Sequence, residues 1–426
     1  MRYGGSSPGS AASNSDSSDF VVGPTGIVGP VRVVRACACQ TRHVPISLAA
    51  GPEIVAIPGP SVVPARVLSA MHRAMPDIYD GELLSVTDEV FDALPGLAGT
   101  ANRGFVTISN GHGAWEMALS NTLSRGDRVL VVNCGLFAAV WGDMAAFNGL
   151  QVETVNAELG RANDPAALEE RLRQDTQHEI TAVLTVHADT SSSARNDIPA
   201  LRAAIDAAGH PALLMVDCIA TMGCERFLMD EWGVDLALAA SQKGLMTPPG
   251  LGFVWPGDRA LAAHQHADLR TRYWDWTART ENGPHYLRYS GTPPVTHLFA
   301  IREALRMIAE EGLEQRWERH RVLADAIRAA VEAWSAPDGL SLHVAEPSER
   351  SNAVTTVRTG DVDAVELARV CKELLGVTLG IGVRDFDGRS FRIGHMGHVN
   401  APMVLGVLGS IEAALGAVDA PIVTAP

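Results

Sequence analysis

Hydrophobic positions along the first 260 residues form short, nearly continuous apolar runs separated by longer amphipathic segments. The apolar runs lie at residues 105–109, 128–133, 152–155, 182–187, 213–217, 234–238 and 251–255. Continuous runs of this length are typical of strands that are buried on both faces, as in a parallel sheet. Segments with helical spacing alternate with them at 114–123, 165–174 and 198–208. The pattern therefore predicts an α/β fold with a mainly parallel sheet flanked by helices.

The pattern changes towards the C-terminus. Helical segments at 297–311 and 313–334 precede a shorter alternation, with strands near 354–358 and 377–379 and helices near 363–375 and 402–417. We expect a large domain at residues 53–312 and a smaller C-terminal α/β domain at 313–426, linked by the amphipathic helix 313–334. Residues 1–52 begin with a Gly- and Ser-rich stretch that lacks periodicity, so they predict a disordered or extended N-terminal arm.

Composition and charge exclude several classes of function. The chain has 426 residues, 46% of them hydrophobic and 19% charged, which favours two domains with a large core. A net charge of −15 without basic runs argues against nucleic acid or an anionic membrane as a partner. The apolar runs are too short to span a membrane. Six cysteines lack the spacing of disulfide or zinc sites, so we expect no metal site and a cytoplasmic location.

Two polar residues interrupt the apolar pattern. Lys243 lies between the runs 234–238 and 251–255, and Asp217 ends the run 213–217. Burial lowers the pKa of a lysine, and a neutral amine can form a Schiff base with an aldehyde cofactor. An aspartate at a strand end can keep a pyridine nitrogen protonated, so the pair predicts a pyridoxal 5′-phosphate (PLP) site. A solvated lysine in a surface loop is the alternative.

A nicotinamide-binding domain is a second way to interpret the alternation of strands and helices. It requires G-x-G-x-x-G after a strand and an acidic residue about 20 positions later. The sequence contains no such arrangement. The pattern therefore favours the PLP site over a dinucleotide site.

The segments around Asp217 and Lys243 resemble the fold-type I PLP enzymes of the class V aminotransferase family, in the alanine/serine–glyoxylate branch. The matching segments are Val216-Asp217 and residues 229–235, 241–246 and 248–251, within a similarity that runs from about Pro58 to Gly397. The resemblance implies the fold-type I architecture, PLP as cofactor, Lys243 and Asp217 as catalytic residues, and a homodimer with active sites at its interface.

The resemblance also implies further cofactor contacts. Asn110, Gly111 and His112 match the phosphate-binding turn, Phe137 the aromatic that stacks on the ring, and Ile219 the apolar residue beneath it; the remaining contacts are Thr190, Gln242, and, across the dimer interface, Tyr289 and Thr292. Each has a structural alternative as well. His112 also fits a buried structural histidine, Phe137 a core aromatic, and residues 289–295 a proline-rich turn before a helix.

Arg392 lies in an otherwise apolar strand at residues 390–394. A buried guanidinium requires a carboxylate partner, and its fork of donors suits a bidentate one. The resemblance implies that this partner is the α-carboxylate of the substrate, and an internal salt bridge is the alternative. The sequence departs from the family pattern at residues 78–82, where many relatives carry a His-Arg pair, and at Asp189 and Ser193, where they carry glutamate and glycine.

The activity that the resemblance implies is transfer of an amino group from a small L-amino acid, serine or alanine, to glyoxylate or a similar 2-oxo acid. Lys243 would move the proton as general acid and base. We find no second arginine for a distal carboxylate, which favours serine or alanine over aspartate. Two alternatives stay open: a PLP lyase of the same fold, like a desulfurase, and a catalytically silent PLP-fold binding protein. A desulfurase requires a reactive cysteine, but Cys371 lies on the apolar face of a predicted helix, where thiols are usually inert.

Overall fold

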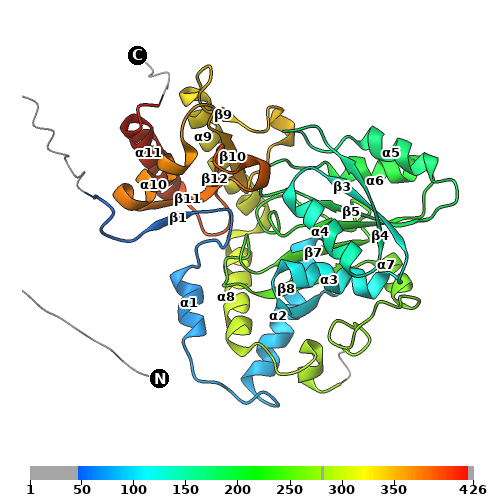
Figure 1. Cartoon of the computed structure of the whole chain (residues 1–426). Coiled ribbons are helices and arrows are strands. Elements are labelled where there is room, and N and C mark those ends of the chain that lie inside the picture. The colour runs from blue at the N-terminus through cyan, green and yellow to red at the C-terminus, as the bar shows by residue number, and fades with distance from the viewer. Residues whose placement is uncertain (1–46, 280–282, 421–426) are drawn as a thin grey trace, which may run out of the picture. The chain divides into compact units, whose positions relative to one another are not determined.

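The computed structural model describes residues 47–279 and 283–420, and a seven-stranded sheet forms the centre of its larger part. All strands of this sheet except β8 run in the same direction, which confirms the predicted mainly parallel sheet. In spatial order the strands are β2 (Phe105–Ser109), β8 (Gly250–Pro256), β7 (Leu236–Ala240), β6 (Leu213–Asp217), β5 (Ile180–Val186), β3 (Arg128–Asn133) and β4 (Gln151–Asn156) (Figure 1).

Both faces of this sheet are buried, which accounts for the continuous apolar runs in the sequence. Along β6, Leu213 and Met215 belong to one hydrophobic core, whereas Leu214 and Val216 belong to the core on the other face. The first core contains residues of α3 (Gly111–Thr122), α4 (Leu136–Phe147) and α7 (Asp258–His264). The second contains residues of α1 (Ala65–Met71), α2 (Glu82–Ala98), α5 (Pro165–Gln174), α6 (Ile198–Ala207) and α8 (Val295–Glu311).

A second, five-stranded sheet is formed mostly by the C-terminal part of the chain. Its spatial order is β1 (Ile54–Ala56), β11 (Val377–Ile381), β12 (Ser390–Gly394), β10 (Val354–Arg358) and β9 (Ser341–Leu342). Its core includes residues of α9 (Leu313–Trp334), α10 (Ala364–Leu375) and α11 (Ala401–Ala417). Short 3-10 helices η1 (His285–Tyr289), η2 (Pro347–Glu349) and η3 (Arg384–Phe386) lie in the connections.

Strand β1 differs from the domain division expected from the sequence. It pairs in parallel with β11, so residues 54–56 join the sheet of the smaller C-terminal part rather than that of the large domain (Figure 1). The chain then crosses to the large domain at residues 57–64. A three-residue strand gives too short a pattern to reveal its partner, and only the pairing with β11 identifies it.

The expected N-terminal arm falls largely outside the described residues, since residues 1–46 are not among them. Just after this segment, the backbone N–H of Leu48 donates to the carbonyl of Leu374 at 2.7 Å. Within the described part of the chain, no helix has both the length and the apolar character needed to cross a membrane.

Candidate active site

A cavity of about 290 Å³ lies at the C-terminal ends of β5, β6 and β7. This edge of a parallel sheet is where open α/β folds bind ligands. The cavity brings together most of the site residues that the sequence predicts. Those lining it are Asn110, Gly111, His112, Phe137, Thr190, Asp217, Ile219, Gln242 and Lys243.

Lys243 follows β7 in the loop that precedes β8, and its Nζ donates a hydrogen bond to the carbonyl of Pro58. Gly59 adopts φ +96°, and a side chain there would collide with the aliphatic stem and Nζ of Lys243. Burial lowers the pKa of Lys243 to about 8, and the nearby guanidinium of Arg392 lowers it as well. A sizeable fraction of the amine is therefore neutral near physiological pH, as a nucleophile or proton acceptor requires.

Asp217, the last residue of β6, is buried and accepts two hydrogen bonds inside the protein. Its Oδ1 accepts from the backbone N–H of Ile219 at 2.6 Å, and its Oδ2 accepts from the indole Nε1–H of Trp115 at 2.8 Å. Desolvation raises the pKa of Asp217 to about 7, although both hydrogen bonds oppose the rise. The carboxylate is thus costly to ionise unless a positive group enters the cavity beside it.

The turn at Asn110 begins helix α3 against the cavity. The Asn110 side chain caps the helix by accepting from the backbone N–H of His112 at 3.0 Å. A side chain at Gly111 would collide with Ile219, so glycine lets the helix start approach the cavity closely. The His112 ring packs against Trp115 with centroids 4.5 Å apart, and partial burial lowers its pKa. His112 is therefore mainly neutral at pH 7 and part of the cavity wall.

Asp189 fixes the position of Phe137. Its carboxylate accepts from the Phe137 backbone N–H at 2.7 Å, so it caps helix α4 from a distant loop. The carboxylate lies so close to Gly135 that a side chain there would collide with it. Asp189 also accepts from the backbone N–H of Ser191 at 2.8 Å. Asp189, whose side chain is one methylene shorter than the glutamate of the family pattern, therefore holds the loop and helix that carry two cavity residues, Phe137 and Thr190.

Arg392 does not line the cavity itself but contacts a residue that does. Its Nη1 donates to the Thr190 carbonyl at 2.9 Å, and its Nε donates to the Ile381 carbonyl at 2.8 Å. Among the described side chains, which do not include that of Asp385, no ion pair or hydrogen bond joins this guanidinium to a carboxylate or occupies its Nη2. The alternative of an internal salt bridge finds no partner among those side chains, and towards them Arg392 keeps donor capacity next to the cavity.

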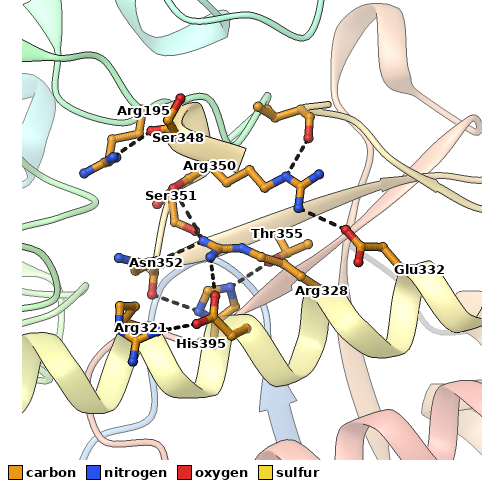
Figure 2. A network of polar contacts seen from close by, with 12 residues as sticks. Arg195, Arg321, Arg328, Glu332, Ser348, Arg350, Ser351, Asn352, Thr355 and His395 are labelled. Carbon is orange, nitrogen blue, oxygen red and sulfur yellow. Dashed lines mark hydrogen bonds and ion pairs between the residues drawn. The ribbon is translucent and has the colours of Figure 1, made fainter. Parts of the chain in front are cut away.

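A polar network connects α9, β10 and the end of β12, the strand to which Arg392 belongs (Figure 2). The ring of His395, three residues after Arg392, bonds Thr355 Oγ1 at 2.9 Å and the Asn352 carbonyl at 3.0 Å. From α9, the guanidinium of Arg328 donates to the Ser351 carbonyl at 2.6 Å and to Asn352 Oδ1 at 2.8 Å. Burial lowers the pKa of His395 to about 3, so it acts as a neutral hydrogen-bonding link.

Tyr289 and Thr292 are the predicted cofactor contacts that do not line the cavity of their own subunit. Tyr289 is fully buried, its hydroxyl donates to Thr87 Oγ1 at 3.0 Å, and its ring packs against Phe91. Within its own subunit Tyr289 packs in the core, and its expected cofactor contact across a dimer interface stays a prediction. Thr292 is exposed, so its expected contact across a dimer interface stays a prediction.

Several residues that line the cavity were not predicted from the sequence. Trp115 is the most informative, and Gly59, Pro60, Ala188, Ala220 and Pro249 complete the wall. A signal for Trp115 was present in the sequence, since it lies four residues after Gly111 and hence on the same face of one helix. Gly59 and Pro60 carry no such signal, because they reach the cavity through a crossover between the two sheets.

Cys371, the cysteine that a desulfurase-like reaction would need, lies in α10 with its side chain fully buried. Burial raises the pKa of its thiol to about 12. Such a thiol is not reactive near neutral pH. In the described ranges, no group of three His, Cys, Asp or Glu side chains is arranged to hold a metal ion.

Comparison with known proteins agrees with this geometry. Residues 97–388 match the family model described as Aminotransferase class-V. Serine–glyoxylate aminotransferase of Methylorubrum extorquens is 40% identical over 367 residues, which cover 84% of this chain and 90% of that protein. L-aspartate–glyoxylate aminotransferase of Paracoccus denitrificans is 36% identical, covering 86% of this chain and 92% of that one. The crystal structure of ureidoglycine–glyoxylate aminotransferase from Bacillus subtilis superposes with a TM-score of 0.79 at 27% identity, over 88% of this chain and 96% of that one.

Proposed function

Because this chain belongs to the class V aminotransferase family, we propose that it is a PLP-dependent transaminase that moves an amino group from L-serine or L-alanine to glyoxylate. The observation that carries the proposal is the meeting of Lys243 and Asp217 in one cavity, with Arg392 beside it. The lysine provides an amine of lowered pKa, the aspartate a buried carboxylate, and the arginine a carboxylate receptor. These are the three groups that transamination of an amino acid requires.

The residues present fit PLP. A cavity of about 290 Å³ lies at the lower end of small-molecule sites, which span roughly 300–1,000 Å³. The Gln242 side-chain oxygen is buried without a hydrogen-bond partner, and within the described ranges Asp217 has no positive partner at bonding distance. The start of α3 at Gly111 directs the positive end of its helix dipole towards the cavity, where a phosphate would be stabilised. Lys243, Asp217, Phe137 and the 110–112 turn would hold the group.

PLP, when bound, supplies an electron sink for the bond cleavage at the substrate Cα. The protein's own residues bind the substrate and transfer the proton. The Arg392 guanidinium binds the substrate α-carboxylate and so orients the Cα–H bond. With the group bound, Lys243 Nζ would accept the Cα proton and donate it again, because its lowered pKa allows both directions of transfer near neutral pH. The buried Asp217 carboxylate would pair with a positive ring nitrogen.

The cavity supports a small amino donor. Among the described residues that line it, Lys243 supplies the one ammonium group, and no arginine is present for a second carboxylate. A dicarboxylic donor such as aspartate would bring an unpaired charge into the cavity, which costs several kcal/mol, on the order of the penalty for burying an unpaired ion. Serine and alanine carry no such charge. The proposed amino donor therefore differs from the L-aspartate in the name of the relative from Paracoccus denitrificans.

We also propose that the protein is a homodimer and that it acts in the cytoplasm. Exposed Thr292, in the segment expected to reach a neighbouring subunit, is the residue that the dimer would use. The described cysteines, Cys134, Cys218, Cys224 and Cys371, are all free thiols, which suits a reducing compartment. Sedimentation of the protein would give its mass in solution, and a monomer would contradict the dimer.

The first test is the visible spectrum of the purified protein with PLP. A band from the lysine-bound cofactor should fade when L-serine or L-alanine is added and return when glyoxylate follows. This cycle requires both half-reactions and so identifies a transaminase. Turnover of the amino acid without glyoxylate would indicate a lyase instead. A band that responds to L-aspartate rather than to serine or alanine would contradict the proposed donor. Absence of a 2-oxo acid product with every amino donor would favour the silent binding protein, and no band at all would contradict PLP as the cofactor.

A further inference from the structure

The hydrogen bond between Trp115 and Asp217 is the feature of the cavity that neither the sequence nor the proposed reaction accounts for. Trp115 lies on α3, whereas Asp217 ends β6, so the bond joins two elements that are far apart in sequence. The indole Nε1–H and the backbone N–H of Ile219 donate to different oxygens of the carboxylate. Each oxygen is therefore tied to one element, and the plane of the carboxylate is fixed.

Because Trp115 can only donate in this hydrogen bond, the bond favours one protonation state of Asp217. An indole nitrogen donates one hydrogen bond and accepts none. A backbone amide is likewise a donor only. Neither group can accept the proton of a neutral carboxylic acid, so both stabilise the ionised form. Trp115 therefore acts against the desolvation that favours a neutral Asp217.

The charges that surround this pair are few. Asp189 favours the neutral carboxylic acid at Asp217, whereas the ammonium of Lys243 favours the carboxylate. Cys218 follows in the chain with a thiol whose pKa is raised by burial, and His112 packs on the Trp115 ring with its pKa lowered. Both are mainly neutral near pH 7. The two hydrogen bonds are thus the protein's principal means of keeping Asp217 ionised.

Packing alone does not require an indole nitrogen at this place. Trp141 stacks on Trp115 with ring centroids 6.0 Å apart and is equally buried, yet its Nε1 has no hydrogen-bond partner among the described residues. Trp255 and Trp276 are buried in the same way, with unpartnered indole nitrogens. These three tryptophans fill core space without using their N–H groups, and Trp115 is different because its N–H is aimed at Asp217.

We propose that Trp115 is a positioning residue for Asp217: its indole N–H orients the carboxylate and favours its ionised form, so that Asp217 can pair with the protonated ring nitrogen of the cofactor. This inference rests on the proposed function, since it concerns how the same cavity holds PLP. It assigns to Trp115 a role that acts through the aspartate, in addition to any contact that its ring makes in the cavity wall.

The test measures binding of pyridoxamine 5′-phosphate to the cofactor-free protein as a function of pH. This ligand has an amine in place of the aldehyde and forms no bond to Lys243, so the titration of the lysine does not dominate the result. Three proteins are compared with the unmodified one: Trp115→Phe, Trp141→Phe as the matched control, and a protein with β-(3-benzothienyl)alanine at position 115. The last residue keeps the shape of tryptophan and replaces the N–H by sulfur.

We expect the affinity of the unmodified protein to fall at acid pH, where Asp217 becomes protonated. In Trp115→Phe and in the benzothienyl protein, the midpoint of this decrease in affinity should lie about one pH unit higher or more, because Asp217 loses a hydrogen bond to its charged form. Trp141→Phe should leave the midpoint unchanged. The KM for the amino donor should change little in the benzothienyl protein, whereas kcat should decrease.

Two results would overturn the inference while leaving the proposed function intact. One is a benzothienyl protein whose pH midpoint equals that of the unmodified protein, which would show that the ring and not the N–H matters. The other is an equal shift in the Trp115 and Trp141 variants, which would indicate a general loss of packing. Failure of the unmodified protein to bind pyridoxamine 5′-phosphate at any pH would instead contradict the proposed function itself. The benzothienyl protein keeps the test decisive if Trp115→Phe does not fold.

Discussion

The guanidinium of Arg392 lowers the pKa of the Lys243 side chain, although the two residues extend from different sheets. Arg392 lies on β12, and Lys243 follows β7. A carboxylate bound to Arg392 would neutralise this effect, because the opposite charge screens the guanidinium from the lysine. Binding of an amino acid should therefore make Lys243 a stronger base when a proton has to be taken from the substrate.

Removing the charge of Arg392 should raise the pKa of Lys243. The attachment of PLP to the cofactor-free protein requires the neutral amine, so its rate should rise with pH around a midpoint of about 8. In Arg392→Gln this midpoint should move to higher pH, as stopped-flow absorbance would show. Arg306→Gln, which removes an exposed guanidinium of α8, is the control and should leave the midpoint in place. A midpoint that does not move in Arg392→Gln would mean that the two cations are not coupled.

Gly59 controls the position of the Lys243 side chain. Gly59→Ala places a methyl group against the lysine stem in a left-handed backbone conformation. We expect a loss of stability of about 1–3 kcal/mol and a decrease in PLP affinity. Gly81→Ala is the matched control, because Gly81 also has a positive φ (+81°) but open space around it. Denaturant unfolding and PLP titration would separate the two effects. Equal PLP affinities for both variants would contradict a specific contact with the lysine.

Asp189 should be required for both stability and cofactor binding. Asp189→Ala leaves the backbone amides of Phe137 in α4 and of Ser191 without their acceptor, which we expect to cost about 1–3 kcal/mol. It should also weaken PLP binding, since Phe137 and Thr190 lose their anchor. The control is Asp164→Ala, which removes the exposed N-cap of α5, a helix that does not line the cavity. It should cost about 0.5–2 kcal/mol without changing PLP affinity. The same PLP affinity in both variants would refute the anchoring role.

Much of the fold was predictable because the strands of the large sheet are buried on both faces. The runs 128–133 and 213–217 coincide with β3 and β6, since a short continuous apolar run is typical of an inner strand of a parallel sheet. The run 105–109 coincides with β2, an edge strand that pairs antiparallel with β8. Helices α2 and α4 were not predicted. Helix α2 does carry a regular amphipathic pattern, with Leu83, Val90 and Leu94 among its buried residues, so its signal was present in the sequence. Helix α4 is apolar on most sides and gives no such pattern.

The candidate site was predictable where a residue belongs to a motif next to a strand. Lys243, Asp217 and the 110–112 turn are of this kind. The hydrogen-bond partners of two other side chains depend on tertiary packing and cannot be inferred from the neighbouring sequence. The indole N–H of Trp115 reaches an aspartate 102 positions away, and Tyr289 turns into the core towards Thr87. The direction of a side chain in a loop or on a helix surface is decided by such partners and not by its neighbours in sequence.

Cys371 offers a direct test against the desulfurase alternative. Because its thiol is buried in α10 with a pKa of about 12, Cys371→Ala should keep the full rate of transamination. The loss of the small buried side chain should cost about 1 kcal/mol of stability. The measurement is the rate of 2-oxo acid formation from serine or alanine with glyoxylate. Loss of activity in a variant that remains folded would revive the cysteine-dependent lyase.

The buried carboxylate of Asp217 should make the cofactor-free protein less stable as the pH rises. Its pKa is about 7 in the folded state against about 3.9 in an unfolded chain. Between these values the folded state retains the proton and the unfolded state releases it, so the free energy of unfolding decreases as the pH rises from about 4 to 7. The total decrease from this group is about 4 kcal/mol.

Urea unfolding of the cofactor-free protein and of Asp217→Ala at a series of pH values would isolate this contribution, with Asp206→Ala as the exposed control. We expect the stability difference between the unmodified protein and Asp217→Ala to shrink with rising pH. Its pH dependence should disappear once PLP is bound, because the positive ring nitrogen then stabilises the ionised form. A difference that stays constant over this range would mean that Asp217 is ionised in the empty cavity, and that the protein alone, through Trp115 and Ile219, already offsets the desolvation.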